Sequence, residues 1–296
     1  MFNKSAATLT ACILILLSCS GQNQKWMNRE VKNDTDLLKT TTWLEALSSS
    51  GSEMGTGYFF YSISQKKFYI ITNRHIVKNY SILVFGFNKN VRSDTFFEID
   101  NLQNHVIYFS NDSVDIAAIP LENIPFLDLS EFPYFKVFTE KNLLTDKESS
   151  RLDLFMENLI SLSFPGLTVV PFPFQPYIFH CSFATPYNFK FQRIDEFCIN
   201  SDLSPGSSGS PIISIRNENG IHKYTLLGTF YYEFADYHSV DSVALDTIKS
   251  SILLPVFDTA VIIDSRRHIL KGYGTVVPLH LGRVIKADKI MELLKR

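Results

Sequence analysis

The chain has 296 residues, with 28 Lys and Arg against 30 Asp and Glu, which gives a formal net charge of −2 at pH 7. This balance offers no basic surface for nucleic acid, so we exclude nucleic-acid binding. The chain also has 25 Phe and 14% aromatic residues, which favour a strand-rich fold because aromatic side chains pack well on pleated sheets.

The first 18 residues are interpreted as a cleaved signal peptide. An apolar stretch over residues 6–17 is too short to span a bilayer, Lys4 precedes it, and small residues follow. The segment 16–19 resembles the lipobox of bacterial lipoproteins, which implies that Cys19 carries a lipid. We therefore expect an exported protein held in the cell envelope, on the outer membrane or the periplasmic face. The alternative is an ordinary secretory signal with an incidental cysteine.

Residues 19–36 are polar and without periodicity, which predicts a flexible tether after Cys19. The remaining residues, 37–296, read mainly as strands in an all-β barrel or sandwich, with a charge-rich crossover over 121–153. The expected strands are 41–47, 57–63, 68–77, 80–87, 95–99, 105–109, 114–120, 159–164, 177–184, 197–200, 210–216, 224–232 and 274–277. Helical periodicity occurs only over 287–296, where Ile290, Leu293 and Leu294 share one face.

Three stretches at the ends of strand-like runs carry the residues for nucleophilic acyl transfer. They supply His75, Asp115 and Ser208, in that order, and Ser208 stands between Gly206 and Gly209. A serine hydroxyl needs an adjacent base such as histidine, and the imidazole needs a carboxylate on its other nitrogen. We therefore expect a Ser-His-Asp triad.

Other residues compete for these roles. Ser204, Ser207 and Ser210 lie in the same stretch, but only Ser208 has a glycine two residues before it and another directly after it. His180 and His238 are interpreted as packing or loop residues, and no cluster has metal-ligand spacing.

These motifs resemble those of trypsin-like serine proteases with the chymotrypsin fold, particularly the bacterial members. The histidine box is 70–77, the aspartate box is 115–117 and the serine box is 206–211; 54–59 resembles the strand that opens the bacterial proteins. The resemblance covers about residues 39–294. It implies two six-stranded antiparallel β-barrels, over 37–150 and 151–296, with a C-terminal α-helix after the second.

The resemblance also implies roles for the residues. Ser208 would be the nucleophile, His75 the general base and then acid, and Asp115 the group that orients the imidazole. The backbone N–H groups of Gly206 and Ser208 would form the oxyanion hole. The expected function is hydrolysis of peptide bonds in protein or peptide substrates through an acyl-enzyme, with no cofactor and no metal.

Specificity and loop geometry are the points where the chain departs from the family. The resemblance implies a possible S1 pocket with its floor near Asp202 and with Gly228 and Thr229 in the strand that lines the cleft. An aspartate there would favour cleavage after Lys or Arg, and the alternative is the structural aspartate that bacterial members often have close by. Ser207 stands where the family usually has an aspartate or asparagine, and Ser210 replaces the usual second glycine.

Two cysteines of the mature chain remain beside Cys19. In an oxidising compartment a disulfide between Cys181 and Cys198 is expected, worth about 3 kcal/mol in the chain-entropy treatment. The alternative is two buried free thiols.

Two other functions remain open on the sequence. One is a catalytically inactive trypsin-fold binding lipoprotein at the cell surface, expected if the three residues lie beyond hydrogen-bond distance. The other is a β-sandwich binding lipoprotein that is not a protease, which requires the three motifs to be coincidental.

Overall fold

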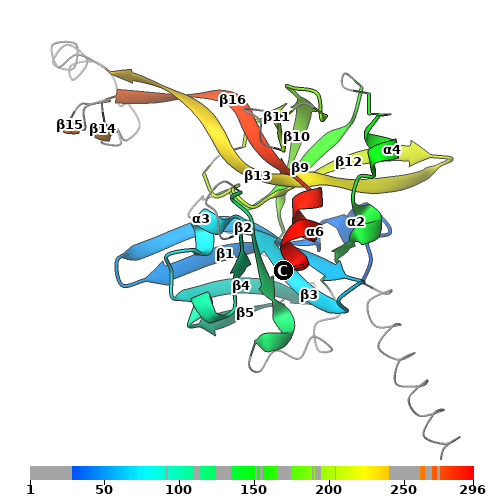
Figure 1. Cartoon of the computed structure of the whole chain (residues 1–296), viewed down its shortest axis with the longest axis horizontal. Coiled ribbons are helices and arrows are strands. Elements are labelled where there is room, and N and C mark those ends of the chain that lie inside the picture. The colour runs from blue at the N-terminus through cyan, green and yellow to red at the C-terminus, as the bar shows by residue number, and fades with distance from the viewer. Residues whose placement is uncertain are drawn as a thin grey trace, which may run out of the picture.

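Figure 1 shows the computed structural model of the chain. The structure describes residues 29–90, 93–109, 114–124, 135–150, 152–153, 156–165, 175–188, 190, 195–203, 205–239, 261–263, 269–271 and 274–296. The expected signal peptide, Cys19 and the first part of the expected tether lie outside these ranges. No helix within them has both the length and the apolar character needed to cross a membrane.

The N-terminal half forms a sheet, drawn in blue to green in Figure 1. Its strands are β1 (Thr41–Ser48), β2 (Gly51–Ser62), β3 (Lys67–Thr72), β4 (Ile82–Asn90), β5 (Ser93–Asp100), β6 (Ile107–Tyr108), β7 (Ala117–Pro120) and β8 (Phe138–Thr139). The order is β5-β4-β1-β2-β3-β7-β6, all antiparallel, and β8 pairs in parallel with β2.

The expectation of a closed six-stranded N-terminal barrel is not met. The described residues form an eight-stranded sheet, and no pairing among them returns from β6 to β5. The edge strand β6 contributes only Ile107 and Tyr108, and both pair with β7. A two-residue strand offers too few backbone groups to close the sheet.

The C-terminal half forms a closed six-stranded barrel, which confirms one of the two expected barrels. Its strands are β9 (Leu159–Ser163), β10 (Tyr177–Phe183), β11 (Glu196–Asn200), β12 (Pro211–Glu218), β13 (Ile221–Ser239) and β16 (Gly274–Lys286). They are hydrogen-bonded in the order β10-β11-β16-β13-β12-β9. Two short strands, β14 (Val261–Ile263) and β15 (Ile269–Lys271), pair with each other.

The expected C-terminal helix is confirmed as α6 (Asp288–Leu294), whose Ile290, Leu293 and Leu294 are buried. Figure 1 shows it, in red, between the two β units. The other helices are one turn long, too short for helical periodicity to reveal them. They are α2 (Asp34–Leu37), α3 (Arg74–Val77), α4 (Asp146–Ser149) and the 3₁₀ turns η1 (Leu102–Asn104), η2 (Leu121–Asn123) and η4 (Glu140–Asn142).

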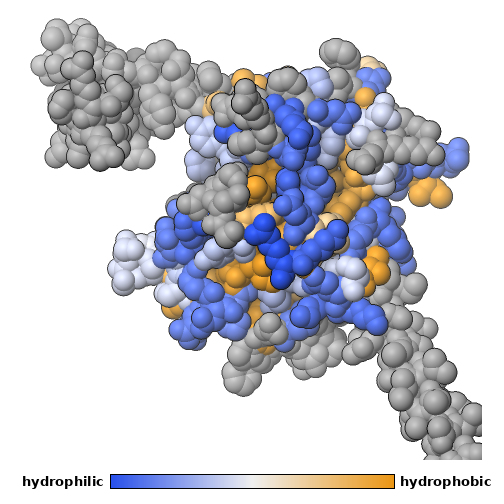
Figure 2. Space-filling view, in the orientation of Figure 1, coloured by the Kyte–Doolittle hydropathy of each residue, from blue (hydrophilic) through white to orange (hydrophobic). Residues whose placement is uncertain are grey.

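A shared apolar core joins the two units. Successive side chains of a strand point to opposite faces, and β2 is buried on both: Phe59 enters the core of the N-terminal sheet, whereas Tyr58 and Phe60 enter the shared core. In the barrel, Ile212 points inward and its neighbour Ile213 enters the shared core. Figure 2 shows hydrophobic residues in the middle of one face, with hydrophilic residues around them.

The flexible tether expected through residue 36 ends earlier than the sequence indicated. The amide of Val137 donates to the carbonyl of Arg29 at 2.9 Å, and Val31 is buried in the shared core. Helix α2 follows, capped by the Asn33 side chain, which accepts from the amide of Asp36 at 2.9 Å. The hydrogen bond to Arg29 and the burial of Val31 therefore attach this segment to the rest of the fold, and the Asn33 cap stabilises its helix.

The expected disulfide is wrong, because Cys181 and Cys198 are both free thiols. The amide of Ala184 donates to the carbonyl of Cys198 at 2.9 Å, which places Cys198 beside a residue that directly follows β10, three positions beyond Cys181. Three strand residues span about 10 Å, beyond the Cα separation of about 7 Å that a disulfide tolerates. Burial raises the pKa of the Cys181 thiol to about 11.

Candidate active site

His75 lies on α3, where the sequence predicted a continuous strand over 68–77. The strand β3 ends at Thr72, and the chain turns into one helical turn that exposes His75 and buries Ile76 and Val77. Asn73 occupies the N-cap position, but its side-chain amide donates to the carbonyl of Asp115 at 2.8 Å instead of capping the helix. This contact ends the strand and ties α3 to the segment before β7.

Asp115 holds His75 through both of its carboxylate oxygens. Its Oδ2 lies 2.5 Å from the ring Nδ1 of His75, and its Oδ1 accepts from the His75 backbone amide at 2.8 Å. The side chains are 40% exposed for His75 and 22% for Asp115. A carboxylate on Nδ1 leaves Nε2 as the nitrogen that can take a proton from a nucleophile.

Ser208 lies in a tight loop directly before β12. Gly206 and Gly209 adopt φ of +91° and +90°, a backbone conformation that favours glycine. The amide of Gly209 donates to the carbonyl of Phe230 at 2.8 Å. The amide of Ser210 donates to the carbonyl of Ser207 at 3.0 Å. Gly206 and Gly209 therefore allow the chain to turn sharply on either side of Ser208.

Ser207, the residue that departs from the family pattern, points into the barrel. It is fully buried, and the Ser163 hydroxyl at the end of β9 lies 2.6 Å from its own. Ser163 was not predictable from the sequence, since a serine that ends an apolar strand has no distinctive spacing. A buried hydroxyl pair thus takes the place of the carboxylate or amide that the family prefers.

The fold brings the serine loop against the segment that carries His75. A Cβ built on Gly209 would lie 2.5 Å from the Thr72 hydroxyl oxygen, and one built on Gly55 would lie 2.9 Å from Ile76 and 3.2 Å from the Ser208 carbonyl oxygen. The serine loop can come this close to the other segment only because neither Gly55 nor Gly209 has a side chain. The serine loop therefore lies beside the end of β3 and the segment that carries His75, where the two β units join.

Within the described part of the chain, no hydrogen bond joins the Ser208 hydroxyl to His75. Nucleophile-to-base hydrogen bonds are often long in enzymes without substrate and shorten in the complex. The backbone amides of Gly206 and Ser208 donate to no other described residue. An oxyanion hole needs two such donors free for the ligand, and the role of these two amides stays a prediction.

The residues expected to line an S1 pocket face other surroundings. The Thr229 side chain is buried and its hydroxyl lies 2.8 Å from that of Tyr58, whose pKa is raised by burial. A Cβ on Gly228 would lie 2.2 Å from the carbonyl oxygen of Ile285. Gly228 and Thr229 are both buried, and their part in an S1 pocket stays a prediction.

Asp202 faces solvent, with 84% of its side chain exposed, and pairs with His280 at 2.9 Å. Near them, burial raises the pKa of Glu233 while His280 opposes the shift. Within the described ranges, no group of three or more His, Cys, Asp or Glu side chains is placed to bind a metal ion.

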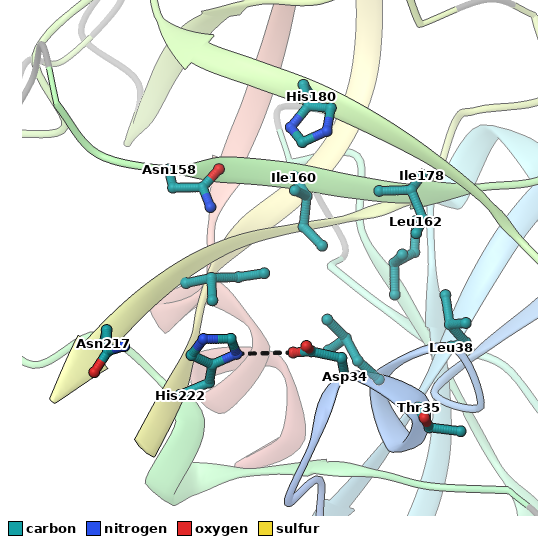
Figure 3. Close-up of a pocket in the computed structure, with 12 residues that line it drawn as sticks. Asp34, Thr35, Leu38, Asn158, Ile160, Leu162, Ile178, His180, Asn217 and His222 are labelled. Carbon is teal, nitrogen blue, oxygen red and sulfur yellow. Dashed lines mark hydrogen bonds and ion pairs between the residues drawn. The ribbon is translucent and has the colours of Figure 1, made fainter. Parts of the chain in front are cut away.

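A cavity of about 510 Å³ lies apart from these residues, between α2 and the strands β9, β10 and β12 (Figure 3). Ile160 and Leu162 line it, and Asp34 pairs with His222 at 3.0 Å at its edge. Hydrogen bonds from Tyr224 and His222 lower the pKa of Asp34. No residue of the predicted triad, oxyanion hole or S1 pocket lines this cavity.

Comparisons with known proteins give a likeness in structure alone. No protein-family model matches the chain, and no curated protein matches it. The active form of the Rv3671c protease from M. tuberculosis is 16% identical, with 89% of this chain and 83% of that chain covered and a TM-score of 0.45.

The serine endoprotease from Yersinia pestis is 12% identical, with coverage of 90% and 67% and a TM-score of 0.44. Tobacco etch virus protease in complex with product is 16% identical, with coverage of 69% and 72% and a TM-score of 0.43. Because these scores lie below 0.5, we base the function on the geometry of the site.

Proposed function

We propose that the protein is a serine endopeptidase that hydrolyses peptide bonds through Ser208, His75 and Asp115. The observation that carries the proposal is the double contact of Asp115 with the Nδ1 atom and the backbone amide of His75. This contact fixes the imidazole tautomer and orientation, and it stabilises the imidazolium that forms during attack.

The proposed reaction begins when the Ser208 Oγ attacks the scissile carbonyl carbon and its proton moves to the Nε2 of His75. The Gly206 and Ser208 amides hold the negative oxygen of the tetrahedral intermediate. The C–N bond then breaks, the leaving amine takes the proton from His75, and an acyl-enzyme remains. Water attacks the ester in the same way, releases the acid and returns the proton to Ser208.

A fluorophosphonate probe tests this proposal, because it forms a covalent bond only with an activated serine. We expect one adduct per chain, on Ser208, and its loss in Ser208→Ala and in His75→Ala. With a cleavable peptide found by library profiling, Ser208→Ala lowers kcat by about four orders of magnitude or more. The same library profiling tests whether the protein cleaves after Lys or Arg, the preference that an aspartate at position 202 would favour.

A catalytically inactive binding protein with the same fold is the second candidate. It is favoured by one observation, the absence of a hydrogen bond between Ser208 and His75 in the described residues. The probe separates the two candidates, since an inactive protein stays unlabelled while it keeps a cooperative thermal unfolding transition.

We also propose that the mature chain is exported and anchored to a membrane by a lipid on Cys19. The support is the apolar segment 6–17 with the lipobox-like residues 16–19. Metabolic labelling with an alkyne fatty acid tests it. We expect the label in the wild-type chain and not in Cys19→Ser, and an unlabelled wild-type chain recovered in soluble form contradicts it.

A further inference from the structure

Thr56 on β2 makes two hydrogen bonds to the serine loop. Its hydroxyl donates to the carbonyl of Gly206 at 2.9 Å, and its backbone amide donates to the carbonyl of Ser208 at 2.8 Å. The same hydroxyl accepts from the amide of Phe164, which follows β9, at 3.0 Å. Thr56 itself is fully buried.

Of the two bonded carbonyls, that of Gly206 lies between the amides of the proposed oxyanion hole, and that of Ser208 directly follows the second amide. The peptide group between Gly206 and Ser207, which contains the Gly206 carbonyl, lies along the chain between the N–H of Gly206 and the N–H of Ser208. Thr56 holds that carbonyl, and it holds the Ser208 carbonyl directly beyond the second amide. The two N–H groups lie in the peptide planes next to these carbonyls, so Thr56 restrains the backbone torsions that set their direction.

Thr56 also connects this loop to β3, the strand that leads into the helix with His75. The Thr72 hydroxyl donates to the Thr56 carbonyl at 2.8 Å, and Thr72 stands three residues before His75. A Cβ on Gly209 would lie 1.9 Å from the same carbonyl oxygen. One residue thus fixes the nucleophile loop and the segment of the base relative to each other.

We propose that Thr56 is a positioning residue, which sets the direction of the two oxyanion amides and holds the serine loop against the β3 end. This inference rests on the proposed function. Thr56 acts through the Gly206 carbonyl, and in the sequence it was visible only as part of the strand 54–59. Misplacement of a catalytic donor by about 1 Å can cost about 100-fold in rate.

The test compares Thr56→Val, which keeps the shape and removes the hydroxyl, with Thr56→Ser, which keeps the hydroxyl. Thr42 supplies a matched control: it is buried, and its hydroxyl donates to the Gly86 carbonyl at 2.7 Å and accepts from the Gly86 amide at 3.2 Å. Thr42→Val therefore removes an equivalent hydroxyl from the same sheet, but between β1 and β4.

The first measurement is the second-order rate constant of labelling by the fluorophosphonate, with the melting temperature of each variant. We expect Thr56→Val to label about 10- to 100-fold more slowly, Thr56→Ser to stay within about threefold of wild type, and Thr42→Val to lose stability without losing labelling rate. Labelling of Thr56→Val within twofold of wild type, or an equal loss in Thr42→Val, overturns the proposal.

Hydrogen–deuterium exchange of the peptide that spans 205–210 separates this proposal from the proposed function. If the wild-type chain takes no label, the peptidase proposal fails, and exchange alone decides the role of Thr56. We expect exchange of this peptide to rise about tenfold or more in Thr56→Val and to stay unchanged in Thr42→Val. Unchanged exchange in both variants overturns the positioning role.

Discussion

The close packing of the serine loop predicts that Gly209→Ala is strongly destabilising. Gly209 has φ of +90°, and a Cβ there would lie 1.9 Å from the Thr56 carbonyl oxygen and 2.5 Å from the Thr72 hydroxyl oxygen. A left-handed conformation costs an L-residue about 1–2 kcal/mol. Displacing packed atoms adds about 1–3 kcal/mol, and losing the Thr72-to-Thr56 hydrogen bond adds about 1 kcal/mol.

We therefore expect the free energy of unfolding to fall by about 3–6 kcal/mol in Gly209→Ala, measured by urea titration. Gly220 is the matched control, because its φ is +83° and a Cβ there would meet nothing within 4 Å. Gly220→Ala then loses only the backbone part, about 1–2 kcal/mol. Equal losses in the two variants would refute the reasoning, because the steric part would then be absent.

Three further outcomes follow from single contacts. A hydrogen bond from Lys223 at 2.5 Å lowers the pKa of Glu148 from 4.5 to about 2, so its stabilisation is present above pH 4.5 and is lost as pH falls toward 2. This partly exposed pair contributes at most about 1 kcal/mol, and Lys223→Met removes that pH dependence in urea titrations. Tyr58→Phe lowers the free energy of unfolding by about 1–3 kcal/mol, because it leaves the buried Thr229 hydroxyl unpaired; a neutral effect contradicts the contact. Cys181, with its pKa near 11, reacts with iodoacetamide at pH 8 about 100-fold more slowly than an ordinary thiol, as followed by mass spectrometry.

The sequence predicted the parts of the fold that alternate over several residues. Most expected strands have a counterpart, and the terminal helix was visible because Ile290, Leu293 and Leu294 repeat at helical spacing. The sequence could not show that the N-terminal sheet stays open, since closure depends on pairing at β6, a strand of two residues. One-turn helices such as α3 carry too few residues for a periodic signal.

The contact between His75 and Asp115 was predictable from their order and from the strand ends beside them. The partners of the serine loop were not, because they come from strands distant in sequence. Ser163 meets Ser207 from β9, and Thr56 from the other unit bonds the carbonyls of Gly206 and Ser208. The disulfide failed for a similar reason: spacing along the chain says nothing about the offset of Cys181 and Cys198 between paired strands.

The central claim is that Ser208 is an activated nucleophile, and intact-mass analysis after fluorophosphonate treatment tests it most directly. The account predicts one adduct per folded chain, mapped to Ser208 and missing in Ser208→Ala and His75→Ala. Asp115→Asn leaves the histidine in the wrong tautomer, so it labels orders of magnitude more slowly. A folded wild-type protein that remains unlabelled, or an adduct that persists in His75→Ala at the wild-type rate, would contradict the account.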